Sequence, residues 1–299
     1  MFNLTATEFA AAKKHNKVFP VHLTVNADQL TPIGMYYNLE GEHKFLFESV
    51  FSEREIGRYS FLGSNPYKSI TSMGEDVTII TDGQPVHKKG KVLDYVKEQV
   101  SIPYLKTDIP LPFVGGAIGY VGYDVIRQYE KLPNVHPPEA YFMFYKQFIS
   151  YDHYQHKMTL VHNVFPEDTE DYETITANLE KLAETMNQTN GIRPFQEVNP
   201  NQEVSSNVSE AEFCKLVEKA KEYIKAGDIF QVVLSQRLTI KSESEPFDIY
   251  RRLRTKNPSP YLFYIDLGDF QVVGSSPESL VTVQDGEVMT NPIAGTRRR

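Results

Sequence analysis

Two polar residues stand in apolar stretches that are typical of strands, and both could take part in catalysis. The stretch GDIFQVVLSQR (227–237) would place Gln231 on one face of an extended strand. A buried amide needs a hydrogen-bond partner, whereas an edge strand could carry the same residue in solvent. The stretch GSSPESL (274–280) places Glu278 after a Pro turn between apolar strands. A carboxylate there could be a catalytic acid, a cap or a solvated group.

The stretch NPIAGTRRR (291–299) combines a Pro-containing turn with three arginines. The Gly-Thr pair is typical of a tight turn that presents backbone N–H groups, which suit an anionic ligand. The formal charge of the chain is −8. Because a protein with this charge is repelled by polyanions, we expect neither nucleic acid nor a membrane as a partner.

Three other signals are weak. The glycines of GGAIGYVGYD (115–124) do not match the G-x-G-x-x-G spacing of a dinucleotide loop, so close strand packing explains them better. The eight histidines are scattered, and His153 with His156 has no matching acidic or thiol neighbour, so no metal site is predicted from them. Cys214 is the only cysteine, which excludes an internal disulfide and favours a reduced, cytoplasmic setting.

The elements that must position these residues can be predicted from periodicity and from turn residues. Ordinary composition and a length of 299 residues predict about two domains. Strands are expected in four aromatic and β-branched stretches, and helices in two amphipathic ones. The strand stretches are HKFLFESV (43–50), GRYSFLGS (57–64), DVTIITDGQPVHK (76–88) and FMFYKQFISYD (142–152), and the helices cover 91–100 and about 168–187. Within the third stretch, TDGQ (81–84) predicts a hairpin turn between two short strands.

A polar, aperiodic stretch at 188–207 predicts a linker or a long surface loop. A helix then begins after Ser209, with Glu212 completing a capping box, and ends at Gly227. A buried strand is expected over 229–240, followed by a helix that stops before Pro258 and by further strands. Strands without regular βαβ alternation indicate an α+β fold with large antiparallel sheets.

Four motifs occur together in the order GDIFQVVLSQR, NPSPYLFYI, SPESL and NPIAGT. In this order and spacing they resemble the chorismate-utilising enzymes, and within them the anthranilate synthase component I family. Upstream, LFES, GRYSFLG and GGAIGYVGYD also resemble that family, so the similarity runs from about Leu30 to Arg299. The resemblance implies sheets packed as a sandwich with helices outside. It divides the chain into a regulatory region (1–187), the linker (188–207) and the first part of a catalytic domain (208–299).

The implied reaction converts chorismate and ammonia to anthranilate and pyruvate. The 4-hydroxyl of chorismate is a poor leaving group, and a positioned carboxylic acid can protonate it. By resemblance Glu278 is that acid. Gln231 stands where the water-using isochorismate and salicylate synthases have Lys, and an amide can orient a nucleophile but cannot deprotonate one. Gln231 therefore indicates an amination.

The resemblance assigns the turn to the substrate. Gly295 and Thr296 would bind a carboxylate of chorismate through a backbone N–H and a hydroxyl. Ala294 separates the family from its nearest alternative, aminodeoxychorismate synthase component I, which has a lysine there. A non-catalytic tryptophan-binding fragment is the other alternative. Because relatives continue beyond this turn, we expect the chain to be truncated and inactive by itself, with ligands for Mg²⁺ beyond Arg299 and no metal ligand within the chain.

The resemblance also implies feedback inhibition and a partner. A site for L-tryptophan would combine LFES with NPSPYLFY, where Glu48 pairs with the amino group and the Pro and aromatic residues surround the indole. Relatives have Leu in place of Phe47 and Met in place of Leu262, and both changes keep apolar bulk. Ammonia would come from a glutamine amidotransferase subunit. The predicted tryptophan-binding residues are Glu48, Ser49, Asn257, Pro258, Ser259, Pro260, Tyr261 and Leu262.

Overall fold

The structure is a computed structural model, and it describes residues 1–49, 57–105, 109–132, 139–188, 193–195 and 202–293. Contacts divide the chain into two compact units, each described here by itself. The first unit contains Met1–Ile192 and Leu253–Pro277, and the second contains Arg193–Arg252 and Glu278–Arg299. Compactness does not assign roles, so the division into a regulatory and a catalytic region stays a prediction.

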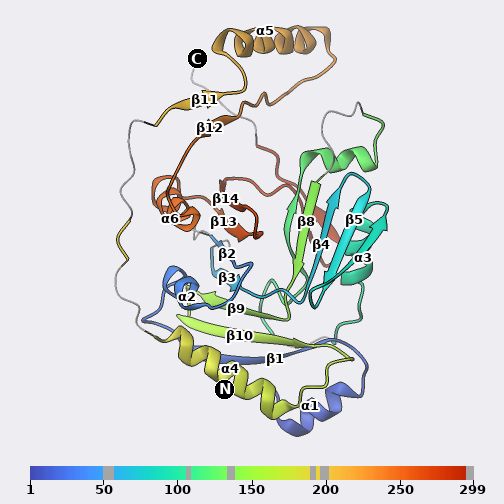
Figure 1. Cartoon of the computed structure of the whole chain (residues 1–299), viewed down its shortest axis with the longest axis vertical. Coiled ribbons are helices and arrows are strands. Elements are labelled where there is room, and N and C mark those ends of the chain that lie inside the picture. The colour runs from blue at the N-terminus through green and yellow to red at the C-terminus, as the bar shows by residue number, and fades with distance from the viewer. Residues whose placement is uncertain (50–56, 106–108, 133–138, 189–192, 196–201, 294–299) are drawn as a thin grey trace. The chain divides into compact units, whose positions relative to one another are not determined.

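The first unit contains a seven-stranded antiparallel sheet with the strand order β1-β10-β9-β3-β2-β13-β14 (Figure 1). Strands from the far end of the unit's sequence therefore complete a sheet that begins near the N-terminus. The bounds are β1 Phe19–Asn26, β2 Phe45–Glu48, β3 Tyr59–Gly63, β9 Gln147–Asp152, β10 Lys157–Val164, β13 Tyr261–Asp266 and β14 Gln271–Ser276.

A second antiparallel sheet in the same unit has five strands in the order β6-β5-β4-β8-β7. One hydrophobic cluster joins both sheets, because it contains Phe45 and Ile265 from the larger sheet and Ile118 and Met143 from the smaller one. The sheets thus pack on each other through a shared core. The bounds are β4 Lys68–Met73, β5 Asp76–Thr81, β6 Gln84–Lys89, β7 Ala117–Val121 and β8 Glu139–Phe144.

Helices cover the sheets of the first unit from outside. Helix α4 (Tyr172–Met186) packs on β1 and β10 through a buried apolar stripe. Helix α3 (Val92–Val100) places Val92 in a second core with Val125 of the 3₁₀ helix η1 (Tyr123–Gln128), behind β4 and β8. Two short helices, α1 (Ala6–Lys13) and α2 (Pro32–Asn38), complete the unit.

The second unit contains helix α5 (Glu210–Ala226) and two small two-stranded sheets. The Ser209 side chain accepts the N–H of Glu212, whose carboxylate accepts the N–H of Ser209, and Gly227 ends the helix at φ 83°. Helix α6 (Pro246–Lys256) carries the chain from the second unit into the first. The paired strands are β11 Val204–Ser206 with β12 Leu238–Ile240, and β15 Thr282–Gln284 with β16 Glu287–Met289.

The predicted α+β class with large antiparallel sheets is confirmed, as are the helices at 91–100, 168–187 and 209–227. Two strand predictions were wrong. The expected buried strand over 229–240 is irregular as far as Arg237, and only β12 forms, exposed and paired with β11. A run of apolar residues becomes a strand only where a neighbouring strand pairs with its backbone, and in the described residues no strand pairs with 229–237.

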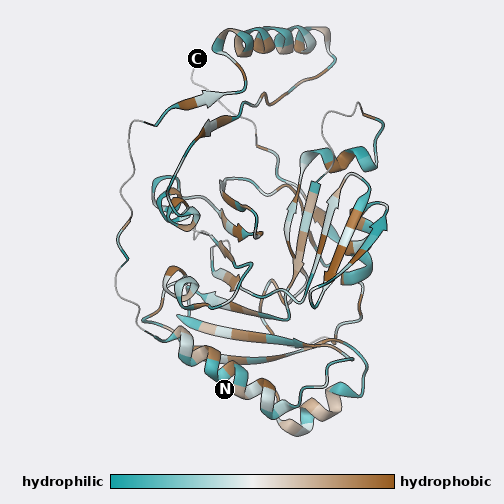
Figure 2. Ribbon diagram, in the orientation of Figure 1, coloured by the Kyte–Doolittle hydropathy of each residue, from teal (hydrophilic) through white to brown (hydrophobic). Residues whose placement is uncertain are grey.

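The second error concerns FMFYKQFISYD, which was predicted as one strand. The chain breaks at Tyr145 and Lys146, so β8 belongs to the five-stranded sheet and β9 to the seven-stranded sheet. The Tyr145 hydroxyl donates to the carbonyl of His43 at 2.7 Å, and its ring lies in the core between the sheets. Aromatic and apolar residues stand on both sides of this break, so the composition of the stretch did not distinguish one strand from two strands in different sheets. Figure 2 shows hydrophobic residues mixed with hydrophilic ones along the strands.

Candidate functional site

A pocket of about 250 Å³ in the first unit lies at the ends of β2 and β3, beside the segment that leads into β13. It brings together residues that the sequence placed far apart, because β2 pairs with β3 on one side and with β13 on the other. Its lining residues are Phe47, Glu48, Ser49, Gly57, Arg58, Tyr59, Phe61, Pro112, Pro260 and Tyr261. We call it the Glu48 pocket.

Glu48 is the buried acid of this pocket, and its side chain is only 2% exposed. The Nε atom of Arg254, in the last turn of α6, lies 2.9 Å from Glu48 Oε2, and the Arg254 side chain is 34% exposed. The Arg254 Nε–H has no aligned acceptor among the described residues, so this contact is an ion pair rather than a full hydrogen bond. A buried carboxylate with a cation beside it can bind a ligand ammonium group.

The Ser49 hydroxyl oxygen is buried and has no hydrogen-bond partner in the part of the chain that the structure describes. A buried hydroxyl usually forms at least one hydrogen bond, and leaving it without one costs free energy. Its position next to Glu48 in the pocket lining gives a bound polar ligand a second contact.

Arg58 forms the polar wall of the pocket and is held by Asp152 of β9. Arg58 Nε lies 3.1 Å from Oδ2 of Asp152, and Nη2 lies 2.8 Å from the same oxygen. Burial opposes the charge of Asp152, but Arg58 and the N–H groups of Gln155 and Tyr154 outweigh it and lower the pKa of the carboxyl. The guanidinium also stacks over the Tyr59 ring at 4.9 Å, which fixes both side chains.

His153 lies near Arg254 on the same side of the sheet. Its Nε2 is 2.7 Å from the Ser60 hydroxyl oxygen, and burial together with the positive charge of Arg254 lowers the pKa of the imidazole. His153 is therefore neutral at physiological pH, which avoids repulsion with Arg254.

The structure brings four of the eight predicted tryptophan-binding residues into the Glu48 pocket, namely Glu48, Ser49, Pro260 and Tyr261. The other four do not line it. Leu262 pairs with Glu48 across the sheet but is 1% exposed and belongs to the core. The Ser275 hydroxyl lies 2.6 Å from the carbonyl oxygen of Asn257 and 2.9 Å from the Ser259 hydroxyl, and these contacts fix the loop before β13. Pro258 lies exposed in that loop.

Sequence reasoning missed several residues of this pocket, including Arg58, Tyr59, Phe61 and Pro112. The motif GRYSFLG contains three of them, and alternation along β3 places Tyr59 and Phe61 on one face of the sheet. That alternation was a usable signal. No signal in the sequence indicated Arg254, because it lies in a helix and reaches Glu48 only in the folded unit.

The predicted catalytic residues lie in the second unit. Glu278 is half-buried after β14, and its Oε1 accepts the N–H of Ile293 at 2.6 Å. This bond ties the SPES turn to the residue just before the predicted substrate turn. Gln231 is exposed in the irregular segment between α5 and β12. The predicted residues Ala294, Gly295 and Thr296 lie outside the described residues.

Two searches of the described residues gave negative results. No group of three or more His, Cys, Asp or Glu side chains in those residues is arranged to hold a metal ion. Among the helices in the described part of the chain, none has the length and apolar character needed to cross a membrane.

Comparison with known proteins adds sequence relatives to this geometry. Residues 42–299 match the family described as chorismate binding enzyme. The chain is 39% identical to anthranilate synthase component 1 from Acetivibrio thermocellus, with 100% of this chain and 64% of the relative covered. It is 36% identical to the protein of the same name from Lactococcus lactis, with 92% and 61% covered. The chain thus spans about three fifths of the length of these curated relatives.

Two solved structures resemble the chain. The structure of anthranilate synthase component I from Streptococcus pneumoniae matches with a TM-score of 0.65 at 32% identity, covering 88% of this chain and 59% of that one. The menaquinone-specific isochorismate synthase from Escherichia coli matches with a TM-score of 0.53 at 11% identity, covering 92% and 55%. At that identity the second match shows a shared fold alone.

Proposed function

The chain belongs to the chorismate-binding enzyme family, and from this premise we propose that it is part of an anthranilate synthase component I. The whole protein would convert chorismate and ammonia to anthranilate, pyruvate and water, as a step of tryptophan biosynthesis. The observation that carries the proposal is the Glu48 pocket, where residues from LFES and NPSPYLFY line one cavity. An acid, a hydroxyl and aromatic walls fit the ammonium, the carboxylate and the ring of an aromatic amino acid.

Glu278 is proposed as the general acid. The 4-hydroxyl of chorismate leaves as water only if it receives a proton as the C–O bond breaks. Ile293 donates to Oε1 of Glu278, and this bond helps to hold the carboxyl group in place. Because Ile293 directly precedes the turn predicted to bind the substrate, this bond supports a role for Glu278 beside the substrate.

Gln231 is proposed to orient ammonia through its amide, while the ammonia itself provides the lone pair for attack at ring carbon 2. Ala294 provides no amine, which favours this reaction over the aminodeoxychorismate alternative. Gly295 and Thr296 would bind a substrate carboxylate. The positions of Gln231 and of this turn in a working site stay predictions.

Two further parts of the proposal concern groups outside this chain. A glutaminase subunit would supply ammonia, since the lone cysteine, Cys214, is exposed on α5. Mg²⁺ is implied by the family resemblance, but the described residues contain no cluster that fits it, so we derive no step through the metal. The cytoplasmic location and the inactivity of the chain by itself also stay predictions.

Calorimetric titration of the chain with L-tryptophan tests the pocket directly. We expect saturable binding by the wild type and none by Ser49→Phe, because the new ring fills the cavity and blocks the ligand. Ser205→Phe, at an exposed position of β11, is the matched control and should bind like the wild type. A wild-type chain that does not bind tryptophan would contradict the proposal, and equal binding by Ser49→Phe would place the site elsewhere.

Because the chain covers 64% of the Acetivibrio relative, we propose to test the activity on a longer protein. The chain should be joined to the C-terminal remainder of the Acetivibrio relative and assayed for anthranilate fluorescence with chorismate, Mg²⁺ and ammonium. We expect turnover from the joined protein, inhibition by tryptophan, and loss of that inhibition with near-normal kcat in Ser49→Phe. Release of a non-aromatic aminated product would favour the aminodeoxychorismate alternative.

A further inference from the structure

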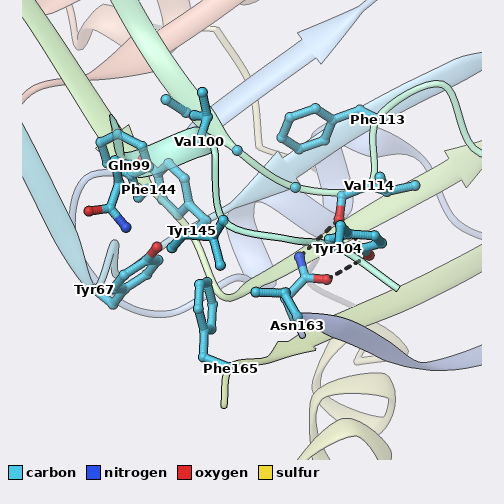
Figure 3. A pocket seen from close by; sticks show the side chains of 15 residues that line it. Tyr67, Gln99, Val100, Tyr104, Phe113, Val114, Phe144, Tyr145, Asn163 and Phe165 are labelled. Atoms are coloured by element: carbon cyan, nitrogen blue, oxygen red, sulfur yellow. Dashed lines mark hydrogen bonds between the residues drawn. The ribbon is translucent and has the colours of Figure 1, made fainter. Parts of the chain in front are cut away.

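A second pocket of the first unit has no role in the proposed function. Its volume is about 350 Å³, and it lies between the end of α3, the loop that leads to β7, and the ends of β8 and β10. Six aromatic rings line it, from Tyr67, Tyr104, Phe113, Phe144, Tyr145 and Phe165. Figure 3 shows Tyr67, Phe144 and Tyr145 toward one side of this space, and Tyr104 with Asn163 toward the other. We call it the α3 pocket.

The lining of the α3 pocket is neutral. None of its 15 lining residues is Asp, Glu, Lys, Arg or His. The nearby ammonium groups already have partners, because Lys68 Nζ donates to Gln99 Oε1 and Lys146 Nζ pairs with Asp168, each at 2.5 Å. Burial raises the pKa of Tyr67 to about 12, so its phenol stays protonated at physiological pH. A charged ligand would lose its hydration here without a charged lining side chain to pair with directly.

A hydrogen-bonded wall fixes the far end of the pocket. Asn163, which is 3% exposed, donates through Nδ2 to the carbonyl of Val114 at 2.9 Å and accepts the Tyr104 hydroxyl at 3.0 Å (Figure 3). A Cβ atom at Gly115 would lie 2.6 Å from Asn163 Nδ2, so only glycine allows this approach. The wall is therefore pre-formed, which lowers the entropic cost of binding.

The Gly115–Gly116 backbone supplies donors at the same end. Both residues line the pocket and have positive φ, at 146° and 121°. A Cβ at Gly116 would meet nothing within 4 Å, so this glycine borders open space. Within the described residues, the two N–H groups have no hydrogen-bond partner. The first two glycines of GGAIGYVGYD thus shape a pocket, whereas Gly119 packs against the backbone of Tyr141 as the sequence predicted.

We propose that the α3 pocket binds a neutral, planar aromatic molecule of one or two rings that carries a carbonyl or carboxamide oxygen. The rings of the lining would stack on the ligand, and the oxygen would accept from the Gly115 and Gly116 N–H groups. The volume suits a molecule of this size. This ligand is chemically distinct from the zwitterion proposed for the Glu48 pocket.

Three probes of nearly equal shape test the charge argument, namely benzamide, benzoate and benzamidine. Ligand-observed NMR titration of the chain at pH 7.5 should show saturable benzamide binding, with a Kd on the order of 1 mM for so small a ligand. Benzoate and benzamidine should bind at least about tenfold more weakly because the pocket offers no counter-ion. Equal binding of the three probes, or no benzamide binding, would overturn the proposal.

Two variants test the location. Val100→Phe places a ring into the pocket from the end of α3, where Val100 is 50% exposed and its replacement spares the core. It should weaken benzamide binding at least about tenfold, whereas Leu93→Phe, on the same helix outside the lining, should not. If Val100→Phe does not fold, as judged by thermal unfolding, Ile102→Trp blocks the pocket from another wall.

A competition experiment separates this pocket from the proposed tryptophan site. Saturating L-tryptophan should leave benzamide binding unchanged, and benzamide should bind Ser49→Phe like the wild type. Displacement by tryptophan together with loss in Ser49→Phe would place benzamide in the Glu48 pocket and overturn the proposal. Failure of tryptophan to bind at all would contradict the proposed function but not this inference.

Discussion

Glu48 and Glu278 are glutamates of the two compact units, and they are held by different partners. Glu48 is almost fully buried in β2 and has the Arg254 guanidinium 2.9 Å away. Glu278 lies in an irregular turn and accepts one backbone N–H, from Ile293 at 2.6 Å. The Glu48 carboxylate thus lies beside a charged side chain of α6, whereas the Glu278 carboxyl is bound by the backbone next to the predicted substrate turn. These different surroundings accompany the different roles proposed for the two glutamates, which are the binding of a ligand ammonium group and the donation of a proton.

Replacing Glu278 tests the second half of this comparison and should have the largest effect. In the complete enzyme, Glu278→Gln keeps the shape but cannot supply the proton, so kcat should fall by about 10²–10⁴-fold with KM little changed. Steady-state assays of anthranilate formation measure this. The control is Glu287→Gln, at an exposed position of β16, which should keep wild-type kcat. A loss in Glu278→Gln below threefold would remove the acid role.

Replacing Glu48 tests the first half. Glu48→Gln removes the charge that pairs with a ligand ammonium group, and truncating one side of a buried charge pair commonly costs about 2–5 kcal/mol of binding, or roughly 30-fold and more. We expect tryptophan affinity to fall by at least that factor in calorimetry. Glu42→Gln, at an exposed position near β2, should leave the affinity unchanged. Unchanged affinity in Glu48→Gln would show that the pocket acid does not bind the ligand.

Replacing Arg254 tests how much the ion pair with Glu48 contributes to ligand binding. Arg254→Gln removes the cation that accompanies Glu48 but leaves the pocket lining intact. Because the Arg254 side chain is 34% exposed and solvent screens its charge, we expect a change in tryptophan affinity of only about 3–10-fold. Arg251→Gln, one turn earlier in α6 and paired with Asp248, is the control. Weaker binding would mean that Arg254 positions the carboxylate, and tighter binding that it competes with the ligand ammonium.

The smallest expected effect is the pH dependence of folding stability that His153 causes. The pKa of His153 is lowered in the folded state by burial and by Arg254, so below its unfolded value of about 6.5 the unfolded chain binds more protons. Stability should therefore fall as pH drops from 7.5 to 5.5, with His153 contributing less than about 1.4 kcal/mol per pH unit. In Arg254→Gln the folded pKa rises toward 6.5, which should reduce this dependence. Urea unfolding at both pH values measures it, and an equal slope in both proteins would contradict the coupling.

The main helices were predictable because their signals are local. The capping box at Ser209 and the glycine at 227 stand at the two ends of α5. The periodic apolar residues of α4 lie within that helix itself. The turn at Asp82–Gly83 between β5 and β6 was equally local. By contrast, the strand predicted over 229–237 depends on a pairing partner elsewhere in the chain, and nothing in its own residues shows whether that partner is present.

The residues of the candidate site were likewise predictable only in part. Motif order in the sequence was sufficient to nominate Glu48, Ser49, Pro260 and Tyr261, and the pocket contains all four. It was not sufficient to separate them from Leu262, which pairs with Glu48 across the sheet but is 1% exposed and belongs to the core. The α3 pocket was invisible in the sequence, where its glycines indicated only close packing.

The sequence by itself determined the family, the α+β class and the residue types available for chemistry. Motifs, periodicity and caps depend on residues that are close together in the chain, so they can be recognised without the structure. Only the tertiary structure decided which residues meet. The pairing of β2 with β13 joined LFES to NPSPYLFY, α6 brought Arg254 to Glu48, and the approach of Gly115 to Asn163 closed one end of a neutral pocket. These contacts join distant segments, and their existence depends on sheet register and packing, which no single segment encodes.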